Sequence, residues 1–212
     1  MASGENRAVD VRVTFRAPTV REGFGAAGKT KQKTATVRRG SESMDIYEAV
    51  QKRYSVRAYR DRAVEEDKLD RVLNAGRLAP SARNCQDWKF VAVRDGATRR
   101  KLAEASEQPW LAKAPVIVAV VSTNPERIMH CRVPAAPVDC AIAADHMTLA
   151  AVAEGLGSCW IGHFDQDRCC EILDVPPAAK IIVLLAMGYP ASDQPPRTRK
   201  PLDEVVCHDT FA

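Results

Sequence analysis

One segment, residues 138–154, restricts the fold of this chain more than any other. Between residues 140 and 153 the only polar side chains are Asp145, His146 and Thr148. A helix here would be apolar around nearly its whole circumference, whereas a surface helix shows a single apolar stripe. The chain has 212 residues, a one-domain length with room for a substantial core. The helix must then lie at the centre of that core or be covered by another subunit.

The remaining apolar segments predict both helices and strands. Asp45 and Glu48 imitate a capping box ahead of a helix that carries Ile46 and Val50. Further helices are expected over residues 65–78, 97–106 and 166–173, and strands over residues 88–93, 115–121, 159–161 and 180–189. Such a mixture indicates an α+β or α/β layer architecture, and we find no internal repeat.

Charge divides the chain into two parts. Residues 1–43 contain nine Lys and Arg against four Asp and Glu, whereas residues 44–212 contain 22 against 23. We expect residues 1–43 to form a flexible basic extension, in which residues 11–15 could add a short strand, and residues 44–212 to form the compact domain. Because the basic excess belongs to the extension, a nucleic-acid surface is not expected.

The extension also contains a phosphate-loop pattern. Residues 23–30, GFGAAGKT, satisfy G-x-x-x-x-G-K-[ST]. That motif needs a buried strand before it and a packed helix after it. Residues 31–43 contain only Ala35 and Val37 as apolar residues, so a helix there has nothing to pack onto a sheet. We therefore interpret the match as chance and rank nucleoside triphosphate binding last.

Several classes of protein are disfavoured by what the sequence lacks. It has no run of about 18 apolar residues and no secretory signal pattern, so we expect a cytoplasmic protein without a membrane segment. The seven cysteines are odd in number and scattered, which argues against a disulfide framework. Neither they nor the four histidines have ligand-like spacing, so no metal site is expected.

A cluster of arginines follows the first predicted helix. It consists of Arg53, Tyr54, Ser55, Val56 and Arg57, with Arg60 and Arg62 shortly after. Guanidinium groups gathered at a helix–loop junction suit bidentate binding of a phosphate or of an electron-rich carbonyl. Such a cluster taken alone is more often a solvated helix end, so both interpretations stay open at this point.

Three further segments also have two interpretations each. Residues 79–88, APSARNCQDW, either offer polar side chains to the edge of a heteroaromatic ring or form an ordinary connection. Residues 155–162, GLGSCWIG, either let the backbone approach a flat ligand or simply stop a helix before a strand. Residues 197–202, RTRKPL, are by themselves a solvated basic run.

In order and spacing these segments resemble the nitroreductase family of FMN-dependent enzymes. The resemblance covers residues 44–206 and rests on the sequences RYSVRAY, LAPSARNCQDWKFVAV, APVIVAVV, AAVAEGLGSCWIGHF and RTRKPLDEVV. It implies an α+β fold with a central mixed sheet flanked by helices, in an intertwined homodimer that holds two FMN molecules at its interface. The partner subunit would then cover the apolar helix at residues 138–154.

The resemblance also implies which residues bind FMN, motif by motif. Those at the ribityl phosphate would be Arg53, Tyr54 (mainly through its backbone), Ser55, Arg197 and Arg199. Arg57 would lie near flavin N1 and the C2 carbonyl, where reduction places negative charge. Along the ring edge would lie Pro80, Ser81, Asn84 and Gln86 of the partner subunit. Beneath the ring, with a backbone contact toward N5, would lie Trp160, Ile161 and Gly162.

Two positions depart from the family pattern. The family commonly has proline before the tryptophan, where this chain has Asp87, and an acidic group there could change the charge preference for the substrate. Tyr54 stands where a second arginine is usual, which weakens the expected grip on the phosphate. Residues 122–137 lie where relatives vary the lid over the flavin. We hypothesise that this segment selects the substrate.

The implied reaction is ping-pong hydride transfer. NADH or NADPH would reduce the flavin at N5, and a nitroaromatic, a quinone or another conjugated acceptor would then occupy the same open face. The flavin carries the chemistry, so no catalytic side chain is required, and Cys85 and Cys159 are expected only to pack. Two alternatives remain: another reduction on the same fold, such as dehalogenation or dehydrogenation of a metabolite, and a flavin-binding module without turnover.

Overall fold

The computed structural model describes residues 44–211. The predictions for residues 1–43, including the strand at 11–15 and the phosphate-loop pattern at 23–30, lie outside them. Four strands form one sheet in the order β1-β2-β4-β3. They are β1 (Trp88–Val93), β2 (Val116–Ser122), β3 (Gly157–Ile161) and β4 (Lys180–Gly188). Each lies within two residues of its predicted position.

The predicted helices are all present in the structure. They are α1 (Ile46–Lys52), α2 (Glu66–Arg77), α3 (Gly96–Ala105), α4 (Ala135–Ala153) and α5 (Gln166–Ile172). Short 3-10 helices, which were not predicted, cover Ala82–Asn84 (η1), Pro109–Lys113 (η2) and Leu202–Glu204 (η3). Helix α4 starts three residues earlier than expected. Pro137 is tolerated there because the N–H groups of a first helical turn have no partner within the helix.

The pairing within the sheet is antiparallel throughout. The resemblance implied a mixed sheet, but the described residues supply a parallel pairing only as an isolated bridge between Ser55 and Ser158. One bridged pair is too short to form a strand. Among the described residues, the sheet is therefore antiparallel except for this one contact at the outer edge of β3. The difference leaves the α+β class unchanged.

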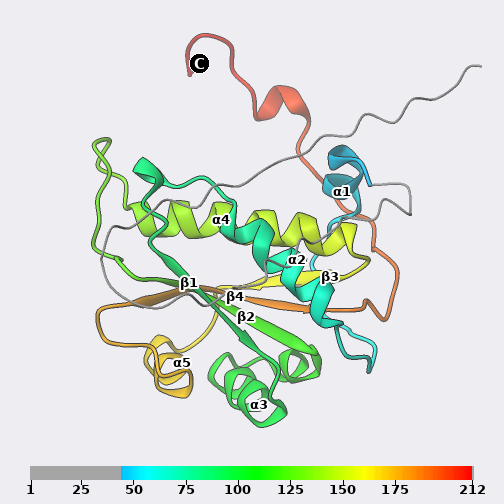
Figure 1. Cartoon of the computed structure of the whole chain (residues 1–212). Helices are drawn as coiled ribbons and strands as arrows, with labels where there is room; N and C mark the ends of the chain where they lie inside the picture. The colour runs from blue at the N-terminus through cyan, green and yellow to red at the C-terminus, as the bar shows by residue number, and fades with distance from the viewer. Residues whose placement is uncertain (1–43, 212) are drawn as a thin grey trace, which may run out of the picture. The chain divides into compact units, whose positions relative to one another are not determined.

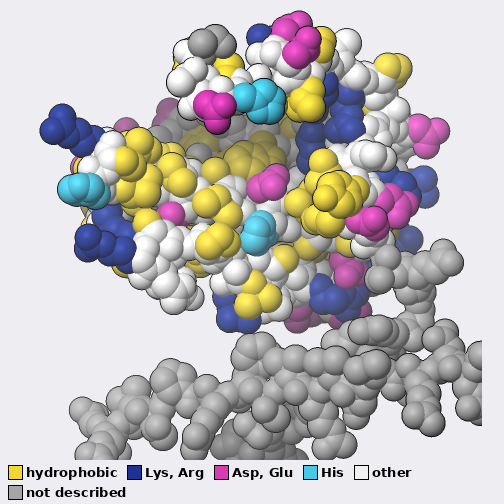
Figure 2. Space-filling view, turned by 90° about the horizontal axis from the view of Figure 1, so that it is seen from above, with side chains coloured by type: hydrophobic (Ala, Val, Ile, Leu, Met, Phe, Trp, Pro, Cys, Tyr) yellow, Lys and Arg dark blue, Asp and Glu magenta, His cyan; other side chains and the backbone are white. Residues whose placement is uncertain are grey.

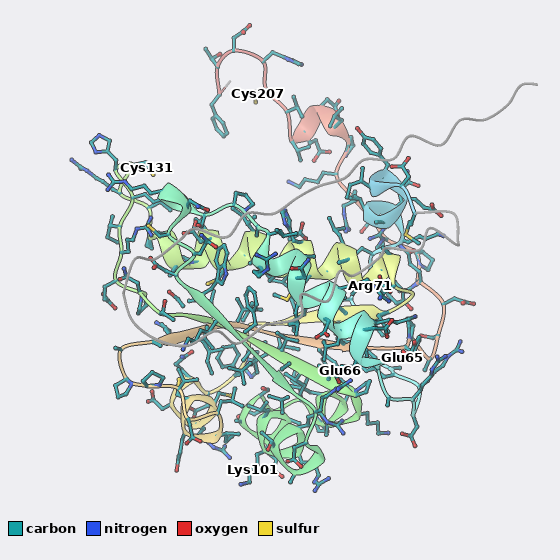
Figure 3. All side chains as sticks on the ribbon, in the orientation of Figure 1. Glu65, Glu66, Arg71, Lys101, Cys131 and Cys207 are labelled. Carbon is teal, nitrogen blue, oxygen red and sulfur yellow. The ribbon has the colours of Figure 1, made fainter. Side chains whose placement is uncertain are left out.

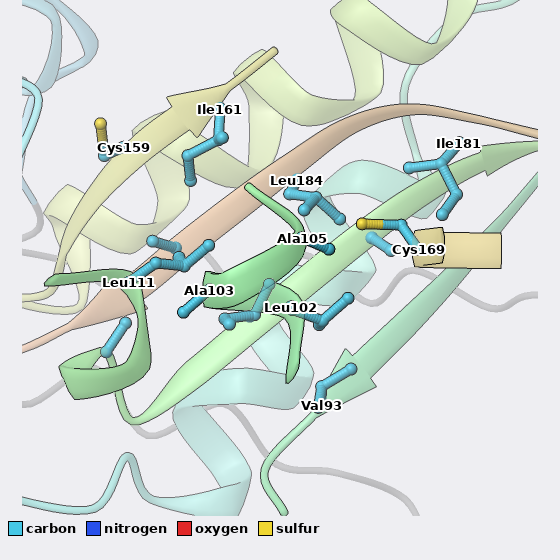
Figure 4. Close-up of a cluster of buried hydrophobic side chains, with 14 of the residues drawn as sticks. Val93, Leu102, Ala103, Ala105, Leu111, Cys159, Ile161, Cys169, Ile181 and Leu184 are labelled. Carbon is cyan, nitrogen blue, oxygen red and sulfur yellow. The ribbon is translucent and has the colours of Figure 1, made fainter. Parts of the chain in front are cut away.

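The sheet is covered on both faces. Helices α2 and α4 lie on one face, and α3 and α5 lie on the other (Figure 1). Strand β2 is consequently buried at every residue, as expected for a strand sandwiched between two helical layers. Figure 4 shows the core on the α3–α5 side, where Leu102, Leu111 and Leu184 are completely buried. The strands thus form a rigid platform, and its edges and ends carry the loops.

Helix α4 is only half covered by its own chain. Cys140, Ala144, Met147 and Ala151 face the sheet and are fully buried. On the opposite side the helix presents further apolar residues that stay partly exposed: Val138, Ile142, Leu149 and Val152. Of the two environments predicted for this helix, burial at the centre of one domain is therefore not found. In residues 44–211, no helix is long and apolar enough to cross a membrane.

Candidate FMN-binding site

The arginine cluster is held against the edge of the sheet. Asp45 caps α1 by accepting a hydrogen bond from the N–H of Tyr47 at 2.9 Å, and the chain leaves the helix at Arg53 in an extended conformation. It then runs beside β3, where the N–H of Val56 donates to the carbonyl of Ser158 at 3.0 Å. The approach is so close that a Cβ on Gly157 would lie 2.4 Å from Val56 Cγ2. Glycine at this position is therefore required by packing.

The C-terminal basic pair returns to the same place. The hydroxyl of Tyr54 donates to the carbonyl of Ser192 at 2.6 Å, which anchors the segment that leads to Arg197. The guanidinium of Arg197 donates to the backbone carbonyls of Arg53 and Gln51 at the end of α1. Residues 144 positions apart are thereby brought together, as the motif match implied. Tyr54 contributes its side chain to this anchor, in addition to the backbone role expected of it.

The charges in this cluster are not neutralised by carboxylates. Partial burial, followed by the neighbouring Arg53 and Arg199, lowers the pKa of Arg197 below its usual value. Within residues 44–211, neither Arg53 nor Arg57 has a side-chain hydrogen bond or an ion pair. Cations that crowd together without counter-charges form a ready site for an anion. This site we call the cationic half-site: Arg53, Ser55, Arg57, Arg197 and Arg199.

Cys159 lies beside the cationic half-site but is not reactive. Burial raises the pKa of its thiol, and Arg57, a hydrogen bond with Ser55 and Arg53 only partly oppose that effect. The thiolate is the nucleophilic form of cysteine, so a raised pKa keeps the side chain inert at neutral pH. The packing role predicted for Cys159 agrees with this environment. The same neighbours place Arg53, Ser55 and Arg57 around the start of β3.

The outer backbone edge of β3 lies next to the half-site. Since the carbonyl of Ser158 points outward to Val56, the alternation of strand hydrogen bonding turns the backbone groups of Trp160 outward as well. The indole of Trp160 is 39% exposed and its Nε1–H donates to Thr148 on α4 at 2.9 Å, which fixes the ring. A Cβ on Gly162 would meet nothing within 4 Å, so space is open there.

The loop at residues 80–86 is strained and well anchored. Arg83, Asn84 and Gln86 all have positive φ angles, between 54° and 56°, which is uncommon for residues other than glycine. The hydroxyl of Ser81 accepts from the N–H of Gln86 at 2.9 Å, which closes the loop. The side chains of Asn84 and Gln86 are exposed. Strain maintained by surrounding structure is typical of binding sites.

Two residues that the sequence did not single out hold this loop. Asp139, buried in the first turns of α4, accepts from the N–H of Ala82 at 3.0 Å through Oδ1, and its Oδ2 has no partner in the described part of the chain. Arg127 donates to the carbonyl of Ala82 and pairs with Asp87 at 2.8 Å. Asp139 falls on the buried stripe of α4, which is the signal that could have identified it.

One chain does not bring its loop and its cationic half-site together. The loop precedes Trp88, which aligns through Ser122 with Lys180 on β4. Ser158, at the half-site, aligns with Met187 on the same strand. Seven strand residues therefore separate them, which is about 23 Å along the sheet. The residues predicted at the phosphate and those predicted at the ring edge thus lie at opposite ends of the sheet, with Trp160 and Ile161 on β3 between them.

The same family emerges from comparison with known proteins. The nitroreductase family model matches residues 50–126 and 104–189. A Thermus thermophilus protein named NADH dehydrogenase is 33% identical over 195 residues, covering 77% of this chain and 95% of that protein. A Methanothermobacter thermautotrophicus protein, named as a putative NADH dehydrogenase/NAD(P)H nitroreductase, is 32% identical and covers 78% and 86%. The structure of an FMN-dependent nitroreductase from Clostridium difficile superposes with a TM-score of 0.67 at 27% identity, covering 77% of this chain and 98% of that one. This chain belongs to the nitroreductase family of oxidoreductases.

Proposed function

We propose that the protein is an FMN-dependent NAD(P)H oxidoreductase that acts as a homodimer. The observation that carries the proposal is the cationic half-site, where arginines from both ends of the domain meet beside β3 without carboxylate partners. Relatives named for NADH, NAD(P)H or FMN support the assignment of donor and cofactor.

The residues present fit the phosphate of FMN. That group carries close to two negative charges, and charge-assisted hydrogen bonds from guanidinium groups are the strongest that side chains offer to it. Arg53, Arg199 and the hydroxyl of Ser55 would bind the phosphate directly. Arg197 already donates hydrogen bonds to the carbonyls of Arg53 and Gln51 at the end of α1. It would therefore hold Arg53 in place and add positive charge to the phosphate site.

Arg57 and the edge of β3 would face the ring system. When bound, FMN supplies the hydride chemistry, accepting hydride from NADH or NADPH and passing it to an acceptor in a separate step. Arg57 would place fixed positive charge where negative charge develops, and fixed charge in a partly dry site stabilises it strongly. Trp160 would support one face of the ring, and Gly162 leaves room for it.

The dimer follows from the separation of the two groups. A second copy would bring Pro80, Ser81, Asn84 and Gln86 of the partner subunit to the cationic half-site, which its own chain leaves open. Apolar side chains that one chain leaves exposed are available for this contact: Ile46, Val50, Leu202, Val205 and Val206. Figure 2 looks down on the α4 side and shows hydrophobic side chains gathered there around a hollow. Exposed apolar side chains that gather on one face are a feature of interfaces.

The segment after β2 would select the acceptor. Residues 123–134 project as a tight turn in which the N–H of Met129 donates to the carbonyl of Val133 at 2.9 Å, and His130, Cys131 and Arg132 at its tip are exposed. The tip lies far from Glu65 and Glu66 at the other end of the sheet (Figure 3). Its base is tied to the loop at residues 80–86, so it would border the acceptor. The acceptors that we propose are nitroaromatics and quinones.

Anaerobic titration of the purified protein with NADH and with NADPH tests the proposal. We expect a yellow protein whose colour bleaches on mixing and returns when a nitroaromatic or a quinone is added. Arg57→Gln should slow bleaching by about tenfold or more, as expected for the loss of one charge-assisted contact. Arg100→Gln, an exposed arginine on α3, is the matched control and should not change the rate.

Each contrary outcome has a clear meaning. A yellow protein that neither nucleotide bleaches would support the flavin-binding module instead of an enzyme. A colourless protein that does not take up added FMN would contradict the cofactor assignment. If replacing residues 129–132 left the acceptor profile unchanged, the role given to the turn would be wrong.

A further inference from the structure

Arg60 and Arg62, which belong to the arginine-rich motif, are not part of the cationic half-site. They line a separate cavity of about 460 Å³ at the end of the sheet where β1 finishes and β2 begins. None of the residues proposed to bind FMN lines it. Five cationic residues and one acidic residue surround it: Arg60, Arg62, Arg94, Arg99, Lys113 and Asp61.

The cavity is built from segments that are distant in the sequence. Arg60 and Arg62 precede α2, Arg94 follows β1, Arg99 lies in α3 and Lys113 ends η2. Cations brought together by folding repel one another, at a cost of about 1 to 4 kcal/mol for a close pair near a protein surface. In this protein the cationic side chains stay close together despite the repulsion. Lysines and arginines on a surface normally point apart into solvent.

Two of the guanidinium groups are fixed by backbone carbonyls. Arg99 donates to the carbonyls of Ala112 and Ala114, at 2.9 and 2.5 Å, and Arg60 donates to that of Pro190 at 2.8 Å. A carbonyl carries no net charge, so these bonds orient the guanidinium without neutralising it. Each guanidinium has five N–H donors. Arg99 also donates through Nε to the carbonyl of Arg94, so its Nη2 group remains for a ligand, and both Nη groups of Arg60 remain. Preorganised donors of this kind reduce the entropic cost of binding.

The remaining cations differ in how they are paired. Lys113 is exposed, and its amine has no hydrogen bond or ion pair in residues 44–211. Arg62 and Arg94 form ion pairs with Glu65 and Glu66 at the exposed rim, so their charges are already balanced. Arg60, Arg99 and Lys113 thus carry three positive charges against the one carboxylate of Asp61, which leaves a net charge of about two around one cavity.

We propose that this cavity is a second anion site, which binds a diphosphate group. Guanidinium forks and a lysine amine are the donors that proteins use for phosphate oxygens. A net positive charge of about two suits a diphosphate, and a cavity of this volume also has room for an attached organic group. Since the site shares no residue with the cationic half-site, the inference does not depend on the proposed function.

Calorimetric titration of the full chain, saturated with FMN, with inorganic pyrophosphate and with ADP tests this inference. We expect saturable binding of pyrophosphate that weakens as ionic strength rises. Lys113→Glu should raise Kd by about tenfold or more, the effect of losing one charged hydrogen bond. Arg60→Gln should weaken binding in the same direction. Tighter binding of ADP would identify an organic diphosphate as the ligand, whereas equal affinity would identify the free ion.

Lys101→Glu is the matched control. Lys101 is an exposed lysine on α3 that points away from the sheet and does not line the cavity (Figure 3). If it weakened binding as much as Lys113→Glu, the effect would be one of overall charge and the proposed site would be wrong. Absence of saturable binding at millimolar pyrophosphate would overturn the inference too, whether or not the protein binds FMN.

Discussion

The guanidinium of Arg127 lies 2.8 Å from the carboxylate of Asp87 and joins two segments that are 40 residues apart. The carboxylate also accepts from the side-chain amide of Asn124, at 3.5 Å, and the pair is more than two-thirds buried on both sides. Asp87, the residue that departs from the family pattern, is therefore paired, and its negative charge does not stand alone near the proposed acceptor site.

Breaking this pair should loosen the turn at residues 123–134. We expect Arg127→Gln and Asp87→Asn each to change kcat/KM for nitroaromatic and quinone acceptors severalfold. The double variant should resemble either single one, because contacting residues are coupled by about 0.5–3 kcal/mol. Steady-state kinetics with both acceptors measures this, and Arg83→Gln, an exposed arginine of the same loop, is the control. Additive effects of the two substitutions would show that the pair does not act as a unit.

The buried carboxylate of Asp139 should be needed for the loop at residues 80–86. Asp139→Ala leaves the N–H of Ala82 without its acceptor, and an unpaired buried donor costs about 1–3 kcal/mol. Asp139→Asn keeps an acceptor oxygen and should cost less. Urea unfolding measures the difference, and Asp145→Asn, at an exposed position on the same helix, is the control. Equal destabilisation by the alanine and asparagine variants would contradict the role assigned to this hydrogen bond.

The outer face of α4 should be required for the proposed dimer. Ile142→Glu and Leu149→Glu place charges where the partner would bury apolar side chains, each worth about 1.5–3 kcal/mol when fully buried. Sedimentation should show monomers, and the FMN content should fall with them. Ala97→Glu, on the opposite side of the sheet, should leave both unchanged. A monomeric wild-type protein with full FMN content would rule out the shared site.

Acid should destabilise the junction between β4 and α2. The hydroxyl of Tyr189 donates to Glu65 at 2.5 Å, and this bond, the backbone of Glu65 and Arg62 together lower the pKa of Glu65 to about 2. A carboxylate with a lowered pKa stabilises the folded state above its ordinary pKa of 4.5. That contribution is lost as the pH falls from there toward about 2. The free energy of unfolding, measured across this pH range, should depend less on pH in Glu65→Gln than in the wild type. Glu171→Gln is the control and should behave like the wild type.

The sequence was sufficient to predict the positions of helices and strands, because short-range patterns of apolar residues encode them. Apolar periodicity located each described strand within two residues. It also predicted that α4 is buried, and the structure shows this for the side of the helix that faces the sheet. The motif match assigned Arg53 and Arg197 to one phosphate, and in the structure the two residues are in contact although 144 positions separate them. Their binding of FMN remains a prediction. Periodicity carries this information because it depends on neighbours three or four positions away.

Apolar periodicity did not predict the contacts between segments that are distant in the chain. Arg127 lies in an irregular segment with no periodicity, so nothing in the sequence pointed to Asp87 as its partner. The antiparallel sheet was missed for a related reason, because strand direction depends on how the connections cross the sheet. The cavity around Arg99 and Lys113 likewise exists only once four segments have folded together.

Because the loop and the cationic half-site lie at opposite ends of β4, two different variants of the chain should be able to complement each other. In a hybrid of the proposed dimer, made of one Arg57→Gln chain and one Asn84→Ala chain, both defects would fall on one of the two shared sites, and the other site would be wild type. Two impaired parent proteins that are mixed, unfolded and refolded together should thus regain activity by complementation. The regained fraction would approach one quarter of the wild-type sites, because half of the dimers are hybrids and half of their sites are intact.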